Sequence, residues 1–137
     1  MSGAFPSLAA LLLLASCSTS PSAPRAVSLD DSFTLAPGQT AQVGNTSLRV
    51  TFESVSADSR CPVDVTCVWE GDAAVIVSLP LTGGARIQHE LHTSGRYPTE
   101  VDAGDYRVRL ADVAPVPRSG ASPAPGDYRA TLLVSRR

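Results

Sequence analysis

Turn-forming residues interrupt this chain so often that they argue against long helices. Eleven prolines and ten glycines occur in 137 residues, and both residue types end or break helices. Beyond residue 29, no stretch keeps an apolar period of 3.6 residues for three turns, whereas several stretches alternate apolar with polar residues. Such alternation is typical of strands with one buried and one solvated face. The chain is therefore expected to fold from short strands.

Eight strand candidates follow from this alternation. Leu48, Val50 and Phe52 give a clean example, and the run from Ala73 to Leu81 is apolar on both faces, which predicts a central strand. The others lie in ranges 33–35, 39–43, 86–92, 97–101, 106–110 and 128–135. We predict an all-β fold, a seven- or eight-stranded antiparallel β-sandwich or small barrel with one disulfide-closed loop.

The N-terminal residues have the composition of an export signal. Residues 1–16 carry no charged side chain, and Leu8 to Ala15 are almost entirely leucine and alanine. This run is too short to span a bilayer but fits a signal sequence. It ends in Leu14-Ala15-Ser16-Cys17, which resembles the lipobox of bacterial lipoproteins. The resemblance implies cleavage before Cys17, attachment of diacylglycerol to its thiol and acylation of the new amine.

This resemblance sets the expected domain organisation and localisation. We expect a lipoprotein signal peptide at residues 1–16, lipidated Cys17 with a flexible tether at residues 17–28, and a single β domain at residues 29–137. Ser, Thr, Pro and Ala dominate the tether, a composition that does not form a core. The expected membrane contact is the lipid at Cys17, since two or more acyl chains anchor stably. Ser18, where an aspartate favours the inner membrane of Gram-negative lipoproteins, implies the outer membrane in such a cell.

Cys61 and Cys67 are expected to form a disulfide. An exported chain meets an oxidising compartment, and the assignment of Cys17 to lipid leaves an even number of thiols. The alternative is a redox pair or a thiolate metal site. Redox pairs usually have two intervening residues, whereas here there are five, with Pro62 directly after the first cysteine. A structural bond is therefore the preferred interpretation.

The segment around these cysteines is the predicted binding surface, because loops on a rigid sandwich often carry recognition. Trp69 shares strand parity with Cys67, which predicts that it packs on the disulfide; the alternative is an exposed aromatic that stacks on a ligand. The acids fit no EF-hand spacing, so no metal and no cofactor are expected, although clustered carboxylates leave a cation site as an alternative. The candidate residues are Asp58, Arg60, Asp64, Trp69, Glu70 and Asp72.

The sequence contains no indication of catalysis. On a strand, His89 and His92 point to opposite faces and cannot share a metal; His89 is expected at the core boundary and His92 at a loop edge. No Gly-x-Ser-x-Gly, Ser-x-x-Lys or His-Glu-x-x-His motif occurs. We therefore predict no enzyme and no catalytic residue. The net charge of -2 has the wrong sign for nucleic acid, so no such partner is expected.

These observations predict a membrane-anchored cell-envelope lipoprotein that acts as a binding or structural module, with an envelope protein as its possible partner. The stretch from Asp58 to Leu81, with its Cys-Pro and Cys-Val-Trp motifs, is similar to small secreted bacterial β-domains; that resemblance implies a fold element and no activity. A protease-inhibitor-like module and a cation-binding module are the alternatives, and a hydrolase is the least favoured.

Overall fold

The computed structural model describes residues 1, 3 and 22–137. Cys17, and the predicted signal peptide apart from Met1 and Gly3, lie outside these residues. Among the described residues, no helix is long and apolar enough to cross a membrane. Residues 22–137 form nine strands and one short 3-10 turn. They are β1 (Arg25–Val27), β2 (Ser32–Leu35), β3 (Thr40–Val43), β4 (Arg49–Asp58), β5 (Ala73–Pro80), β6 (Arg86–His92), β7 (Glu100–Ala103), β8 (Tyr106–Ala114), η1 (Pro125–Asp127) and β9 (Arg129–Arg136).

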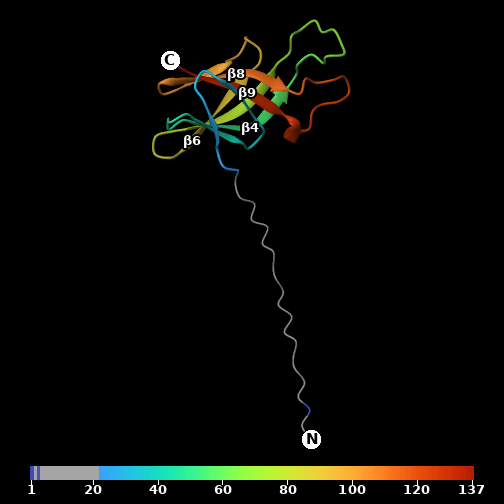
Figure 1. Ribbon diagram of the computed structural model, residues 1–137. Coiled ribbons are helices and arrows are strands. Elements are labelled where there is room, and N and C mark those ends of the chain that lie inside the picture. Colours follow the sequence, from blue (N-terminus) through green and yellow to red (C-terminus); the bar gives the residue numbers. More distant parts are fainter. Residues whose placement is uncertain (2, 4–21) are drawn as a thin grey trace.

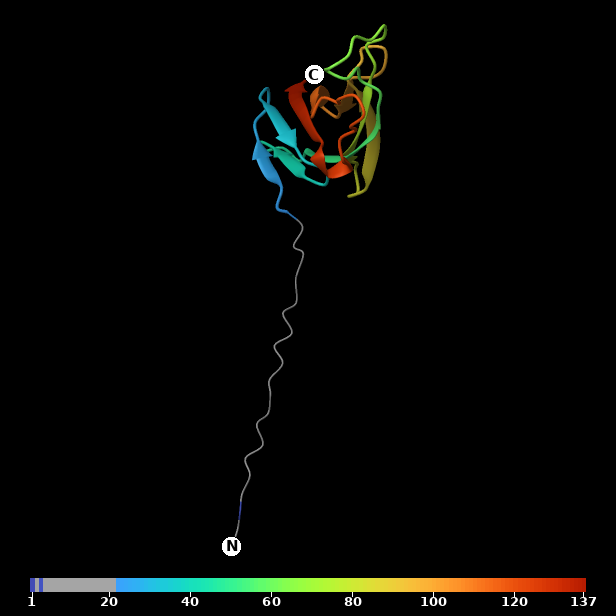
Figure 2. The same ribbon diagram turned by 90° about the vertical axis from the view of Figure 1, so that its right-hand side faces the viewer.

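The strands form two sheets that face one another across a single core. One sheet has the order β1-β3-β4-β5-β6 and the other the order β2-β9-β8-β7. In Figure 1, β8 and β9 lie above β4 and β6, and Figure 2 shows the same layers after a turn of 90°. The prediction of a fold that is nearly all β is therefore confirmed.

Two details of the predicted architecture are wrong. The described residues contain nine strands, because Arg25–Val27, assigned to the tether, form β1. This strand was missed because three residues in a Ser-, Pro- and Ala-rich stretch show no alternation; it pairs with β3 in parallel, so the sheet is not purely antiparallel. The fold is also not a barrel. Each sheet keeps two free edges, β1 and β6 in one and β2 and β7 in the other, and no strand pair joins the sheets in the described part.

Two strands extend well beyond their predicted ends because bulges hide them in the sequence. The pairing of β4 with β5 shifts register twice, between Phe52 and Ser54 and between Val55 and Ala57. The pairing of β8 with β9 shifts between Leu110 and Asp112. A bulge adds one residue and reverses the inward and outward alternation. The alternating pattern therefore stops at each bulge while the strand continues.

The core consists of aliphatic and aromatic side chains from both sheets. β5 lies between β4 and β6, which confirms that it is an internal strand. The largest fully buried side chains come from β2 to β6, β8 and β9: Phe52, Leu35, Leu79, Leu91, Leu132, Val43, Val50, Val75, Val77, Val108, Val113 and Val134. Their burial stabilises the fold by about 1.5 to 3 kcal/mol for each large side chain. The sandwich is thus a rigid support for the loops at its ends.

Candidate binding surface

A narrow neck separates the predicted binding segment from the sandwich. β4 ends at Asp58 and β5 begins at its paired residue Ala73, and residues 59–72, which we call the disulfide loop, project between them. At the neck, the Ser59 amide donates to the Asp72 carbonyl (2.7 Å) and the Asp72 amide donates to Ser59 Oγ (3.1 Å). A Cβ on Gly71, whose φ is +73°, would lie 2.1 Å from the Ser59 carbonyl oxygen. Only glycine fits this position.

The disulfide loop is cross-linked internally and tied to a second loop. Cys61 and Cys67 form the predicted disulfide, with 5.9 Å between their Cα atoms. The Val63 amide donates to the Pro117 carbonyl (3.0 Å), and the Ser119 amide donates to Asp64 Oδ1 (2.9 Å). This second bond lowers the pKa of the Asp64 carboxyl. The disulfide loop and residues 115–121 therefore form one restrained unit.

A charged clamp anchors the same unit to the sandwich. Arg60 binds Asp58 through two bonds, Nε to Oδ1 (2.8 Å) and Nη2 to Oδ2 (2.7 Å), and it donates to the Val113 and Pro115 carbonyls. Tyr128 donates its hydroxyl to Asp58 Oδ2 (3.0 Å). Burial raises the pKa of Asp58, but the bonds from Arg60 and Tyr128 outweigh it, so the net pKa is lowered. Both clamp side chains are largely buried.

A second buried polar cluster fixes the other side of the neck. Asp72 Oδ2 lies 2.6 Å from His92 Nδ1, and Asp72 Oδ1 accepts from the Ser94 amide (2.9 Å). Burial raises the pKa of Asp72, but these partners reverse the shift and lower it. His92 Nε2 also lies 3.3 Å from Glu90 Oε1. His89 lies on the opposite face of β6, toward the other sheet, so the predicted divergence of the two histidines is confirmed.

Beyond these restraints, the disulfide loop exposes apolar side chains that form what we call the tip. The tip consists of Val63, Val65, Val68 and Trp69. Val68 is 92% exposed and Trp69 is 70% exposed. The Arg96 guanidinium lies 5.8 Å from the centre of the Trp69 ring. Exposed Val116 and Tyr97 belong to the neighbouring segments that hold the loop.

The prediction that Trp69 packs on the disulfide is therefore wrong. In sandwiches with a tryptophan against a disulfide, the bond joins the two sheets inside the core. Here the Cys61–Cys67 bond closes a loop outside the core, so no apolar surroundings exist in which Trp69 would be buried. Trp69 is instead an exposed aromatic side chain, which was the alternative interpretation.

The structure divides the six predicted surface residues into two groups. Asp58, Arg60 and Asp72 have internal partners and support the loop. Asp64, Trp69 and Glu70 lie on its exposed surface, and of these Asp64 also supports the loop through the bond from the Ser119 amide. Sequence reasoning missed Arg96 and the tip valines as part of this surface. The valines carried a signal, an apolar run in a loop, but the proximity of Arg96 to Trp69 is a tertiary contact.

The acids of this region are dispersed. Among the described residues, no three His, Cys, Asp or Glu side chains converge to hold a metal ion. The disulfide loop, green in Figures 1 and 2, lies at the end of the domain opposite to the point where the chain leaves toward its N-terminus. Comparison with protein families, curated proteins and solved structures finds no match to this chain.

Proposed function

We propose that this protein is a lipid-anchored module of the bacterial cell envelope that binds a protein partner through the tip. The observation that carries the proposal is the presentation of Val68 and Trp69, both strongly exposed, on a loop held by a disulfide, a glycine neck and two buried polar clusters. Exposed apolar groups cost solubility unless they serve an interface. Tryptophan is also enriched at the energetic centres of protein interfaces.

Rigidity explains why such a small surface would suffice for binding. Association is opposed by the ordering of loops and side chains, at roughly 0.5 to 1.5 kcal/mol for each side chain that becomes fixed. The backbone of the disulfide loop is already fixed by Cys61–Cys67 and by the Ser119 contact to Asp64. Most of the loop-ordering cost is therefore met during folding. A partner would mainly gain the apolar contact area of the tip.

The resemblance of Leu14-Ala15-Ser16-Cys17 to a lipobox supports the proposed anchor, and the shape of the domain agrees with it. A chain held at Cys17 would place the domain beyond a short tether, and the disulfide loop, at the opposite end of the domain from this attachment, would be free to point away from the membrane. This orientation favours a partner in the periplasm or at the cell surface over the lipid itself. In a Gram-negative cell, Ser18 favours the outer membrane.

Crosslinking in intact envelopes tests the proposed surface. We expect partner capture by the wild-type chain to fall at least about tenfold in Trp69→Ser, because a central interface tryptophan typically contributes about 2 kcal/mol or more. The melting temperature should stay unchanged, because Trp69 makes little contact with the core. The matched control is Asn45→Ala, an exposed change in the β3–β4 turn. Equal capture by Trp69→Ser and wild type would remove the tip from the proposal.

Membrane fractionation tests the anchor separately. Cys17→Ala should release the protein from the membrane pellet, while Ser18→Ala, next to it, should leave the protein there. Mass spectrometry of the wild-type N-terminal peptide should find the acyl chains. A Cys17→Ala protein that still sediments with membranes would refute lipidation at Cys17 without affecting the tip.

A protease-inhibitor-like module is the second candidate, and one observation favours it. Val68 and Trp69 follow Cys67 directly and lie exposed beside the disulfide, so their peptide bond is presented on a restrained loop. Incubation with a panel of serine and cysteine proteases separates the two functions. An inhibitor would block a protease stoichiometrically and lose this effect in Val68→Asp. Absence of inhibition across the panel, together with capture of a partner that is not a protease, would favour the binding module.

A further inference from the structure

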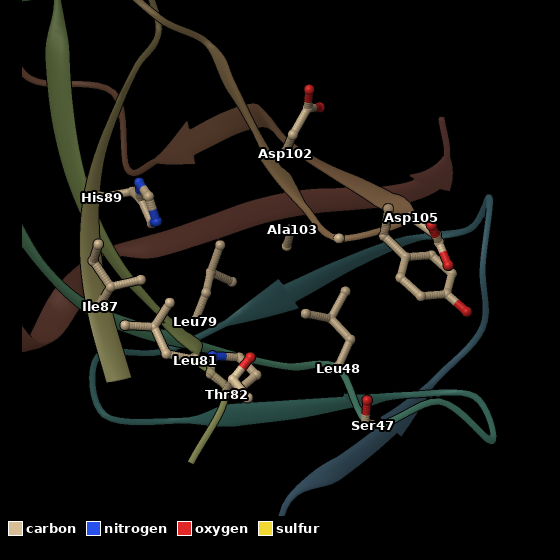
Figure 3. Close-up of a pocket in the computed structure, with 13 residues that line it drawn as sticks. Ser47, Leu48, Leu79, Leu81, Thr82, Ile87, His89, Asp102, Ala103 and Asp105 are labelled. Atoms are coloured by element: carbon tan, nitrogen blue, oxygen red, sulfur yellow. The ribbon is translucent and has the colours of Figure 1, made fainter. Parts of the chain in front are cut away.

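The two sheets leave an open cleft between their edges β6 and β7, at the end of β5 opposite to the disulfide loop. The cleft has a volume of about 610 Å³. Figure 3 shows Ile87 and His89 of β6 on one side and Ala103 and Asp105 of the β7–β8 hairpin on the other. Leu48 and Leu79, both buried core residues, lie at its floor. The cleft therefore reaches the hydrophobic core from outside.

Exposed apolar side chains surround this opening. Leu81 is 48% exposed and Ile87 is 39% exposed, and both line the cleft. Together with the tip, they account for most of the large apolar side chains that are strongly exposed in the described part of the chain. An occupant with apolar groups would cover both residues and reach Leu79.

The backbone of β6 is free along the same opening. Just before β6, the Ala85 carbonyl accepts from the Leu81 amide and so points toward β5. At the end of β6, the His92 amide donates to the Pro98 carbonyl and so points away from β5. Hydrogen-bonding direction alternates along an antiparallel strand, so Arg86, Gln88 and Glu90 direct their backbone groups away from β5. Among the described residues, no backbone partner covers Gln88 or Glu90 on that side.

We infer that β6 and the cleft form a binding site for an extended peptide segment of another protein, which adds to the five-stranded sheet as a sixth strand. Its backbone would pair with Gln88 and Glu90. Alternate side chains of an added strand point to one face, so every second residue would enter the cleft beside Leu81 and Ile87. Strand addition of this kind is a recurrent mode of peptide recognition. The peptide should be apolar at alternate positions.

Charge at the rim favours a basic residue in the peptide. Asp102 and Asp105 lie on the hairpin side of the cleft. Arg107 and Arg137 balance the two carboxylates of Asp102 and Glu100: Arg107 lies 2.7 Å from Asp102 and 3.2 Å from Glu100, and Arg137 lies 3.2 Å from Asp102. Asp105 has no ion pair among the described residues, so it leaves a negative charge at the rim. A lysine or arginine beside the apolar positions would complement that charge.

A second copy of this chain fits the site less well. The inner face of a second β6 would offer a single exposed apolar side chain, Ile87, followed by His89, because Leu91 is buried. On the outer face, Arg86 already donates to Thr51 Oγ1 (2.8 Å), and Glu90 already accepts from Ser56 (2.9 Å). These groups would have to leave their partners to pair across a symmetric interface. We therefore assign the site to a foreign segment.

A matched pair of variants at Gln88 tests the site. The probe is a displayed library of random peptides of about nine residues, long enough to span the open edge, selected on the full chain as isolated from expressing cells. Enriched peptides should alternate apolar residues and carry Lys or Arg. Gln88→Pro removes an outward amide but no bond to β5, so these peptides should bind it about tenfold more weakly. Gln88→Ala keeps the amide and should bind like wild type.

Two further measurements make the result decisive. Leu81→Ser should also weaken the selected peptides, whereas Trp69→Ser should not, which separates this site from the tip. Equal melting temperatures of Gln88→Pro and Gln88→Ala would show that the fold is intact. Peptides that bind Gln88→Pro and wild type equally, or a library that yields none, would overturn the inference. A dimer in sedimentation that Gln88→Pro dissociates would replace the foreign segment with a second copy.

Discussion

Gly71 is the position where a single methyl group should most weaken the candidate binding surface. Its φ of +73° lies in the left-handed region, and a Cβ there would lie 2.1 Å from the Ser59 carbonyl oxygen and 2.7 Å from the Arg60 Cα. Real Cβ contacts begin above 3.0 Å. Gly71→Ala therefore forces the neck apart by about 1 Å, a displacement that closely packed backbone does not absorb.

The expected cost has two parts. Placing alanine in the left-handed region costs roughly 1 kcal/mol. Opening the neck weakens the bonds between Ser59 and Asp72, and each contributes about 1 kcal/mol. We expect Gly71→Ala to lower the free energy of unfolding by about 3 kcal/mol in total. For a domain of this size, that is a fall in melting temperature of roughly 10 °C or more.

Gly120→Ala is the matched control. Gly120 has nearly the same φ, +72°, but no atom lies within 4 Å of the position that a Cβ would occupy there. It should therefore lose only the roughly 1 kcal/mol of backbone strain. Urea unfolding of both variants provides the comparison. If the two variants lose the same free energy within about 0.5 kcal/mol, the close approach at the neck is not what requires glycine, and the reasoning fails.

Three further predictions concern the supports of the disulfide loop. Cys61→Ser should lower the free energy of unfolding in urea by roughly 2 to 3 kcal/mol, because it frees a closed loop of about seven residues; an unchanged denaturation midpoint would contradict a structural role for the bond. Tyr128→Phe should cost about 1 kcal/mol by removing the bond to Asp58, and a Tyr128→Phe protein as stable as wild type, beside a destabilised Tyr128→Leu protein, would show that only ring packing matters. Because the folded state lowers the pKa of Asp58 below its ordinary 3.8, its contribution is present above about pH 4 and is lost as the pH falls toward the folded pKa. Asp58→Asn should therefore be less stable at pH 7 and lose less stability between about pH 5 and pH 2, as thermal unfolding across that range would measure; parallel pH profiles of the two proteins would exclude Asp58 as a source of the acid sensitivity.

The fold class and the covalent cross-link could be predicted from the residue pattern alone. Alternation at Leu48, Val50 and Phe52 and the doubly apolar run of β5 depend on local burial, which the pattern records directly. The Cys61–Cys67 bond follows because a pair close in sequence is also close in space. The pattern failed at the bulges and at β1, where pairing with distant strands, and not local alternation, decides the conformation.

Long-range contacts determine which residues of the candidate surface are free to bind. Asp58 and Arg60 are as polar as Glu70 in the sequence, yet Tyr128 and the Val113 carbonyl, more than 50 residues away, enclose them in a buried clamp. Trp69 is as apolar as a core residue, yet its loop leaves it in solvent. The cleft beside β6 likewise exists only because two sheets stop short of closing. Burial and pairing of this kind arise when distant segments meet, and a local pattern carries no record of that meeting.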